Sequence, residues 1–381
     1  MISYCANIHP VHSWVETISA LDANLPEIKR HLQTLNNQPN LPTIGLGLWL
    51  SNAAVETLSQ DANELINLQI FLQKHDCEVE TMNAFPYGHF HGKRVKESVF
   101  RPDWSSTDRL TYTCRVADIL SQIGKGDFLS ISTLPGSHKT FSANRQKIWA
   151  NVEALTRHLH HLYETTGKLI KVGFEPEPFG LFDNTWESIE FFNELKNFSR
   201  IPHLIEKHIG ITYDTCHFAL QNENPKDSFN LWNDYNIDVV KIQFSNALAF
   251  KPNNLESLVH LAPFNEPIYF HQTRIDTPQS SYLFPDLNEA LAWAHTRPHE
   301  IPESHWKIHY HIPVHHHPQS PFLDTSDHLK QTIEALSLCP TRLHLEVETY
   351  TWQVLPQSLQ SSLSQQVAAE IHYIEQLLPL V

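Results

Sequence analysis

Short runs of alternating apolar and polar residues follow one another along the chain, separated by longer stretches with helical spacing. Nine runs have the length and composition of strands: ISYCANIH, TIGLGLWLS, EVETMNAF, FLSISTLPG, IKVGFEPEP, IGITYDTCH, VVKIQFSN, KIHYHIPVH and RLHLEVETY. Between them apolar residues recur three, four or seven positions apart, as from Val55 to Leu72 and from Ile148 to Leu162. Strands that alternate with helices indicate βαβ units and a parallel sheet.

Several of these runs have one apolar and one polar face. In the fifth, Val172 and Phe174 oppose Glu175 and Glu177, and the sixth, seventh and last runs repeat the pattern. Central strands of an open, doubly wound sheet are apolar on both faces, whereas a barrel can turn its polar side chains toward a closed interior. Since the chain also has no GxGxxG or GxxxxGK[ST] turn, the pattern predicts an α/β protein, a single (β/α)8 TIM barrel over residues 1–381.

Nine strand candidates for eight places in a barrel leave one run over. We expect the extra element in residues 246–340, an insertion or elaborated loop region at the barrel mouth, between the last strands. This region contains FNEPIYFHQTRI, which we interpret as a hairpin, then the helix-like DLNEALAWAH and the strand-like KIHYHIPVHHH.

Composition narrows the classes of function. The chain has 27 Lys and Arg against 42 Asp and Glu, a net charge of −15, and 26 His. This balance argues against a nucleic-acid partner near neutral pH, because phosphate backbones are bound mainly by Lys and Arg. Five cysteines without CxxC spacing suit free thiols, and the first residues, MISYCANIHP, lack the pattern of a signal peptide. We therefore expect a cytoplasmic protein.

Chemistry-bearing side chains stand at the carboxyl ends of the predicted strands, where barrels place reactive groups. They are Glu175, Asp214, His217, Gln243, His309, His311 and Glu346. Carboxylates that point into one closed space repel each other unless a cation is present, so a divalent metal is expected; Mn²⁺, Mg²⁺, Fe²⁺ and Zn²⁺ all stay open. A carboxylate pair such as Glu175 and Glu346 beside a metal could move a proton next to a carbonyl, which is isomerase or epimerase chemistry.

The motifs FEPEP, YDTCH and LEVET, in this order, resemble the xylose-isomerase-like TIM-barrel superfamily of sugar phosphate isomerases and epimerases, which includes endonuclease IV. The resemblance implies Glu175, Asp214 and Glu346 as metal ligands and His217 as a substrate contact. Where that superfamily has a histidine on the seventh strand, this chain has Gln243. His311, or alternatively His271, is the candidate fourth ligand. The further candidate contacts for a small polyol or sugar-like substrate are His271, Arg274, His89, His91, Gln243 and His309.

Longer strings spread over nearly the whole chain resemble the metabolite traffic protein EboE family. They are YCANIHP, NAFPYGHFHG, RPDW, SISTLPG, YDTCHFA, YFHQ, HYHIP and HLEVETYTW. The resemblance implies a cytosolic barrel, encoded in a gene cluster with a prenyltransferase-like membrane partner, that serves the delivery of a secondary-metabolite precursor for export.

Three hypotheses follow. The first is a metal-dependent isomerase or epimerase, and the second is a non-catalytic carrier that hands the precursor to the membrane partner, which Gln243 favours. The third, an endonuclease IV-like phosphodiesterase, conflicts with the charge of −15. The carboxylates could also be structural, held by Arg or backbone donors. Cys216 has no base at motif spacing, so we interpret it as a packing residue.

Overall fold

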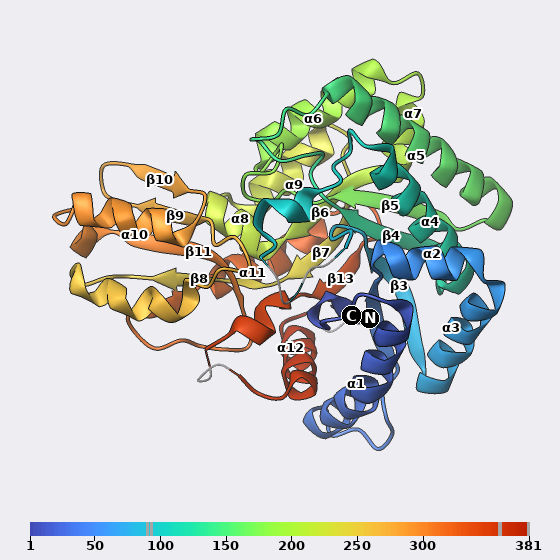
Figure 1. Ribbon diagram of the computed structural model, residues 1–381, viewed down its shortest axis with the longest axis horizontal. Helices are drawn as coiled ribbons and strands as arrows, with labels where there is room; N and C mark the ends of the chain where they lie inside the picture. Colours follow the sequence, from blue (N-terminus) through green and yellow to red (C-terminus); the bar gives the residue numbers. More distant parts are fainter. Residues whose placement is uncertain (89–90, 92–93, 357–359, 379–381) are drawn as a thin grey trace.

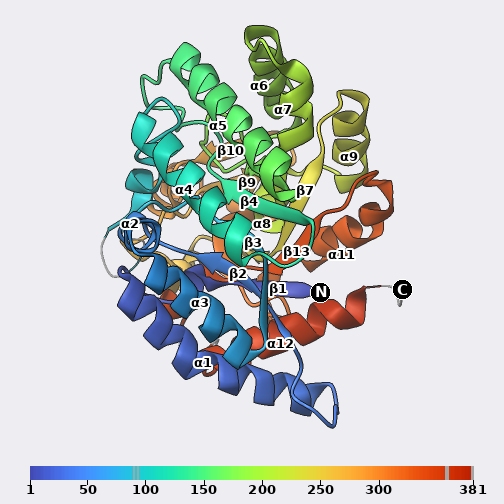
Figure 2. The ribbon, with the colours of Figure 1, turned by 90° about the vertical axis from the view of Figure 1, so that its right-hand side faces the viewer.

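Eight parallel strands close into a barrel in the computed structural model, which describes residues 1–88, 91, 94–356 and 360–378 (Figures 1 and 2). Around the barrel the strands run in the order β1, β13, β7, β6, β5, β4, β3, β2. Their bounds are β1 Ile2–Cys5, β2 Ile44–Trp49, β3 Cys77–Asn83, β4 Phe128–Thr133, β5 Leu169–Phe174, β6 Ile209–Asp214, β7 Val239–Phe244 and β13 His344–Val347. The predicted (β/α)8 barrel is confirmed.

Helices cover the outside of the barrel and bury the apolar faces of its strands. They are α1 Trp14–Leu35, α2 Asn52–Gln60, α3 Ala62–His75, α4 Thr107–Ile123, α5 Arg145–Thr166, α6 Thr185–Phe198, α7 Pro202–His208, α8 Thr215–Gln221, α9 Pro225–Asp234, α11 Ser326–Ala335 and α12 Leu363–Leu377. Their starts follow from local sequence: Ser13 and Glu16, for example, form a capping box at α1. None of the described helices combines the length and hydrophobicity that a membrane span needs.

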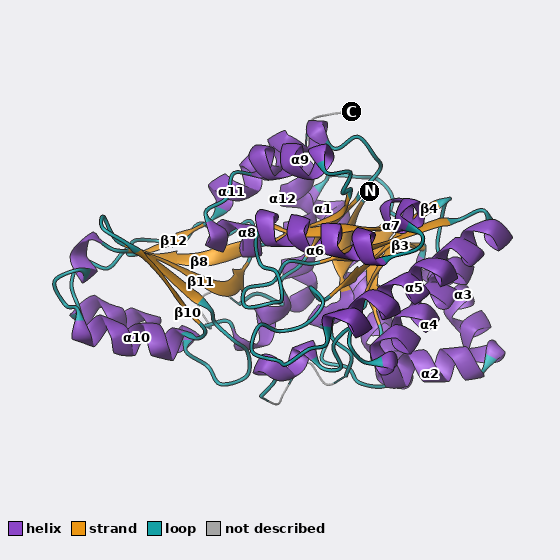
Figure 3. Cartoon of the chain, turned by 90° about the horizontal axis from the view of Figure 1, so that it is seen from above, coloured by secondary structure: helices purple, strands orange, loops and turns teal. Residues whose placement is uncertain are grey.

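A second sheet projects from one end of the barrel (Figure 3). Its antiparallel strands lie in the order β10, β9, β11, β8, β12. They are β8 Asn246–Phe250, β9 Thr273–Asp276, β10 Ser281–Phe284, β11 His305–Ile312 and β12 Phe322–Asp324, accompanied by α10 Leu287–Thr296. Trp306, Ile308 and Phe250 belong to a hydrophobic core separate from the main one. The surplus strand-like run of the sequence is therefore KIHYHIPVH, which forms β11 outside the barrel.

The hairpin of this second sheet begins only at the last three residues of FNEPIYFHQTRI and continues beyond it. It is formed by β9 and β10, with Thr273 opposite Phe284 and Asp276 opposite Ser281. Most of FNEPIYFHQTRI is irregular, and Tyr269, Phe270 and Gln272 from it line a cavity at the barrel mouth. Tyr269 and Phe270 of this segment thus line a cavity, whereas the pattern predicted that they form a hairpin.

A buried ion pair lies inside the barrel. Lys241 Nζ on β7 is 2.6 Å from Glu346 Oε1 on β13, and both side chains are fully buried. Gly47 on β2 makes room for this carboxylate, because a Cβ there would lie 1.5 Å from Glu346 Oε2. The polar interior that the alternating pattern predicted therefore contains charges.

Candidate functional site

Three carboxylates from different strands meet at the carboxyl end of the barrel. Glu175 follows β5, Asp214 ends β6 and Glu348 follows β13, and all three are buried. One oxygen from each lies within 4.8 Å of an oxygen of the other two. Backbone bonds fix the two loop residues, since the N–H of Glu175 donates to Thr133 and that of Glu348 to Phe244.

Asp214 has two roles, one for each oxygen. Its Oδ1 caps α8 by accepting from the backbone N–H groups of Cys216 (2.7 Å) and His217 (3.2 Å), and it also accepts from Ser245 Oγ (2.7 Å). Its Oδ2 is buried and has no hydrogen-bond partner among the described residues. The capping bonds therefore fix the carboxylate with its second oxygen directed away from the helix.

Glu348, and not Glu346, joins Glu175 and Asp214 in this cluster. Three amides hold Glu348: Asn7 Nδ2 (2.6 Å) and Asn83 Nδ2 (3.3 Å) donate to Oε1, and Gln243 Nε2 (2.6 Å) donates to Oε2. Glu346 is two residues earlier on the same face, where it pairs with Lys241. Glu348 therefore occupies the place in the cluster that was expected for Glu346 as a ligand and base. Gln243 holds the Glu348 carboxylate.

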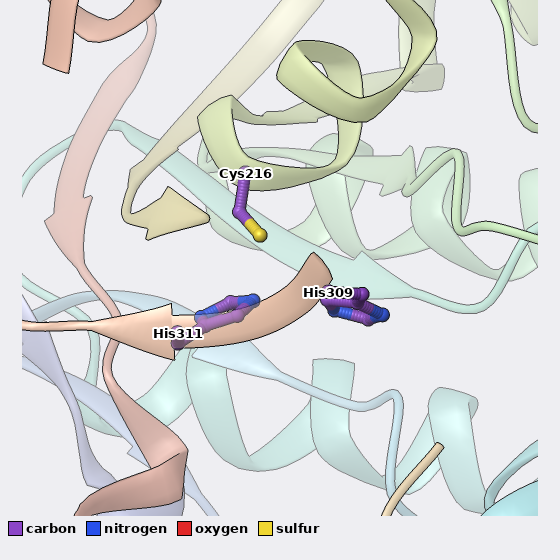
Figure 4. Close-up of side chains that lie close together, drawn as sticks. All are labelled: Cys216, His309 and His311. Carbon is purple, nitrogen blue, oxygen red and sulfur yellow. The ribbon is translucent and has the colours of Figure 1, made fainter. Parts of the chain in front are cut away.

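Strand β11 of the second sheet carries His309 and His311 (Figure 4). Each of them lies close to a carboxylate of the site. The pairing of β11 with β8 shifts between Ile308 and His311, so that an irregularity lies where the strand reaches the barrel mouth. Such irregularities re-aim side chains. His311 lies in one group with Asp214 and His217, and His309 in another with Glu177 and His217.

The ring nitrogens of these histidines can be assigned from their partners. Nδ1 of His217 is 3.0 Å from the Pro176 carbonyl oxygen and Nδ1 of His311 is 2.9 Å from the Glu348 carbonyl oxygen. Nδ1 of His309 is 2.7 Å from Gln272 Oε1. Since these oxygens only accept, each Nδ1 carries the proton and each Nε2 of the neutral ring has a free lone pair, the arrangement of metal-binding histidines.

Glu177 and two of these histidines form a second, adjoining group. His217 Nε2 lies 3.1 Å from Glu177 Oε2 and 3.1 Å from His309 Nε2. Two neutral Nε2 atoms that both carry a lone pair cannot donate to each other, so a bound cation would relieve this contact. Glu177 is slightly exposed, with 12% of its side chain accessible. This group can therefore exchange protons with a molecule in the cavity.

Burial and mutual repulsion dominate the charges of the site. Burial, together with neighbouring carboxylates, raises the pKa values of Glu175 and Glu177 well above their usual range and that of Glu348 to about 8. Burial lowers the pKa of His217 to about 4. The three glutamates favour protonation here while His217 favours neutrality, so a bound cation would stabilise the ionised carboxylates.

Three buried atoms in the cluster lack a hydrogen-bond partner among the described residues. They are Glu175 Oε2, Asp214 Oδ2 and His311 Nε2. Buried polar atoms are almost always satisfied, and all three are electron-pair donors. Asp214 belongs both to the group with Glu175 and Glu348 and to the group with His217 and His311. The residues present fit a divalent metal with oxygen and nitrogen ligands: Glu175, Asp214, Glu348 and His311 could hold it.

Cys216 lies beside His309 and His311, with its sulfur within 4.8 Å of a nitrogen of each (Figure 4). Burial raises the pKa of the Cys216 thiol well above its usual value, so the thiolate needed for metal binding or attack is disfavoured. The side chain packs with Leu220 and Ala247. The packing role expected for Cys216 remains the simplest interpretation.

A cavity opens above the cluster. Glu175, Glu177, His217, His309, His311 and Glu348 form its floor, with Asn7, Asn83, Gln272, Tyr269 and Tyr350 beside them. The rest of the lining comes from the loop after β3 and from the segment of the insertion that precedes β9. A small molecule in this space would contact both acceptors and histidines.

Two expected substrate contacts have other partners. His271 is buried, with Nε2 2.7 Å from Glu266 Oε1 and Nδ1 3.0 Å from the His309 carbonyl oxygen. Arg274 pairs with Asp276 at 3.0 Å on β9. Neither belongs to the described lining of the cavity. Both lie in the second sheet or just before it, and they support the strand that carries His309.

The loop after β3 contains the expected substrate contacts His89 and His91. His91 is buried and contacts the carbonyl oxygen of Asn7 and the hydroxyl of Tyr269 (2.8 Å). Because Asn7 and Tyr269 line the cavity, His91 supports its lining. His89 lies outside the described residues.

Four site residues were not singled out from the sequence: Glu348, Glu177, Asn7 and Asn83. The glutamates carried a signal, since each stands two positions after a candidate glutamate on the same strand face. The asparagines carried none of comparable strength. Their role depends on the closure of the barrel, which brings β1 and β3 beside β13.

The chain is similar to known proteins in its fold and not in its sequence. No protein-family model and no curated protein sequence matches the chain. Among solved structures, it is similar to the IOLI protein with a bound zinc atom, with 12% identity and a TM-score of 0.49 over 99% of this chain and 97% of that one. It is also similar to the probable 3-DHS dehydratase AsbF from Bacillus anthracis, with 12% identity and a TM-score of 0.46 over 98% of each chain. A further likeness, to the 3-keto-D-glucoside 4-epimerase YcjR from E. coli, has 12% identity and a TM-score of 0.37 over 64% of this chain and 78% of that one.

Fold and site together define the class: a (β/α)8 barrel with a carboxylate- and histidine-rich site at the carboxyl ends of its strands, completed by a strand from a second sheet.

Proposed function

We propose that the protein is a metal-dependent isomerase- or epimerase-like barrel that moves a proton on a carbon next to a carbonyl. The observation that carries this proposal is the set of buried donor atoms without partners, Glu175 Oε2, Asp214 Oδ2 and His311 Nε2, at the floor of a cavity. Glu348 completes the set of oxygen and nitrogen donors. A divalent metal bound there would polarise the carbonyl of the substrate.

Glu177 is the base in this proposal. It lines the cavity next to the donor set, and burial raises its pKa, so it accepts a proton more readily than an exposed carboxylate. The carbon–hydrogen bond breaks, its proton goes to Glu177, and its electron pair moves toward the neighbouring carbonyl. His217 and His309, which contact each other and Glu177, hold the proton in reach of the adjacent carbon.

The setting proposed for this reaction is the one implied by the EboE resemblance. The substrate is a hydroxylated precursor of a secondary metabolite, handled in the cytoplasm and passed to a membrane partner from the same gene cluster. The strings HYHIP and HLEVETYTW support the link, because they contain His309, His311 and Glu348. Isolation of the tagged protein with a membrane protein of its own gene cluster would support the partner, and a monodisperse chain without it would count against it.

A non-catalytic carrier is the second candidate. Gln243 favours it, because an amide stands where the resembled superfamily has a histidine, and this amide holds Glu348. A carrier would bind a hydroxyketone without exchanging its carbon-bound protons.

Metal content and proton exchange test both candidates. We expect about one divalent ion per purified chain, lost in Glu175→Gln and Glu348→Gln and kept in Glu334→Gln, a matched change at an exposed glutamate. With hydroxyacetone in D₂O, we expect deuterium at the carbon next to the carbonyl with the metal-loaded protein and none with Glu177→Gln. A chain that binds no metal overturns the proposal, and a loaded chain that binds the probe without exchange supports the carrier instead.

A further inference from the structure

The cavity has two chemically different sides. Its floor consists of the carboxylates and histidines of the candidate site. A second part of the lining, called the wall from here on, consists of apolar side chains: Phe85, Pro86, Val95, Val99, Phe100 and Phe270. A molecule that reaches the floor therefore lies with its other end against this wall.

The wall is held in place by contacts within and between its two segments and with His138. Val95 of the loop after β3 donates a backbone hydrogen bond to Ile268 of the insertion at 2.7 Å. The rings of Phe85 and Phe100 meet edge to face at 5.5 Å, and the ring of Phe270 stacks on His138 at 6.3 Å. These contacts fix the positions of the rings that line the cavity.

Polar groups next to the wall are already engaged within the protein. Lys96 forms an ion pair with Asp286. The Gln272 amide donates to the Pro178 carbonyl oxygen (3.1 Å) and accepts from His309 (2.7 Å). A polyol with a hydroxyl on every carbon would find few donors or acceptors at this end, and buried hydroxyls without partners lower affinity.

We propose that the substrate carries an aromatic group next to its oxygen-bearing end, and that Phe85, Phe100 and Phe270 receive this group. An aromatic ring buries a large apolar area without needing hydrogen bonds, and it packs favourably against the faces and edges of phenyl rings. The inference rests on the proposed function, because the floor must hold the oxygens for the wall to meet the rest of the molecule.

Two hydroxyketones test the inference, because they share the same metal-binding end. 2-Hydroxyacetophenone has a phenyl group where hydroxyacetone has a methyl group. We expect metal-loaded protein to bind 2-hydroxyacetophenone at least about tenfold more tightly in calorimetric titration, since the phenyl group buries more apolar area. Phe270→Ala should weaken binding of the phenyl compound about fivefold or more and leave that of hydroxyacetone unchanged. Phe198→Ala, at a phenylalanine that is 45% exposed, is the matched control and should change neither.

Each other outcome is decisive. Equal affinity for the two compounds, no binding of either, or an equal effect of Phe270→Ala on both overturns the inference. The metal content of the same samples separates it from the proposed function. A chain that holds its metal and exchanges protons of hydroxyacetone, yet does not prefer the phenyl compound, refutes only the aromatic substrate, whereas a chain without metal refutes the proposed function.

Discussion

Glu346 and Glu348 show how neighbours decide what a carboxylate does. They lie two residues apart on the same face of one strand end, so their sequence context is nearly the same. Lys241 neutralises Glu346 inside the barrel, whereas three amides hold Glu348 beside two other acids. Amides orient a carboxylate without neutralising it, which leaves Glu348 able to bind a cation.

Removal of the charge of Glu346 should destabilise the fold. In Glu346→Gln, Lys241 stays buried without its ion partner, and we expect the free energy of unfolding to fall by about 3–5 kcal/mol in urea titrations with a chelator present. The double variant Lys241→Met with Glu346→Leu should recover most of this loss, since it removes both charges. Equal stability of Glu346→Gln and the unchanged chain would show that the pair contributes nothing.

Sequence could predict that both glutamates face the barrel interior, because the period of two fixes the face. The sequence could not predict how far each glutamate lies from the carboxyl end of the barrel. Depth depends on the register between β13 and β7, in which Glu346 lies opposite Gln243, and on the position of Lys241 in the same barrel. The amides of Asn7 and Asn83 come from residues far away in the chain, so no local pattern indicates them.

At the scale of elements, β11 is the unusual part of the site. The eight barrel strands and their helices were predictable, because alternation of strand and helix and polar inner faces are local patterns. The pairing of β11 with β8 and β9 is not local, although the strand itself was visible in the sequence. The expected hairpin was misplaced because Tyr269 and Phe270 resemble strand residues but line the cavity.

Loss of His311 on β11 should weaken metal binding, whereas loss of another histidine of the same strand should not. We expect His311→Gln to lower the affinity for Zn²⁺ or Mn²⁺ at least about 100-fold, because it removes the unpartnered Nε2 of a histidine that lies close to Asp214. His305→Gln, an exposed residue on the same strand, should leave the affinity unchanged. Competition with a chelating dye measures both. Unaltered affinity in His311→Gln would exclude β11 from the metal site.

At the scale of the whole molecule, Glu370 links three regions of the chain. It lies on α12 and accepts from Thr349 Oγ1 (2.5 Å), next to Glu348, and from the backbone N–H of Val314 (3.2 Å), just after β11. Burial raises the pKa of Glu370 from 4.5 to about 7. The folded state therefore keeps a proton that the unfolded chain releases, and the contribution of Glu370 to stability falls as pH rises from about 4.5 to 7.

Glu370→Gln should remove this pH dependence. Glutamine keeps an oxygen that can accept from Thr349 and Val314, but it does not ionise. Relative to the unchanged chain, the variant should gain about 3 kcal/mol in free energy of unfolding between pH 4.5 and pH 7.5, and little beyond. Urea titrations at these two pH values measure the difference. A gain of the opposite sign would mean that Glu370 is ionised in the folded protein.

The donor atoms of the site come from two sheets that have separate hydrophobic cores, Glu175, Asp214 and Glu348 from the barrel and His311 from the second sheet. An ion held by all four would act as a cross-link between the two sheets. A ligand present at about 1,000 times its dissociation constant contributes about 4 kcal/mol to the folded state. We therefore expect calorimetry of the metal-free chain to show two heat-absorption peaks and of the loaded chain a single one. In cells, metal supply would then set the lifetime of the whole protein against proteases as well as its activity.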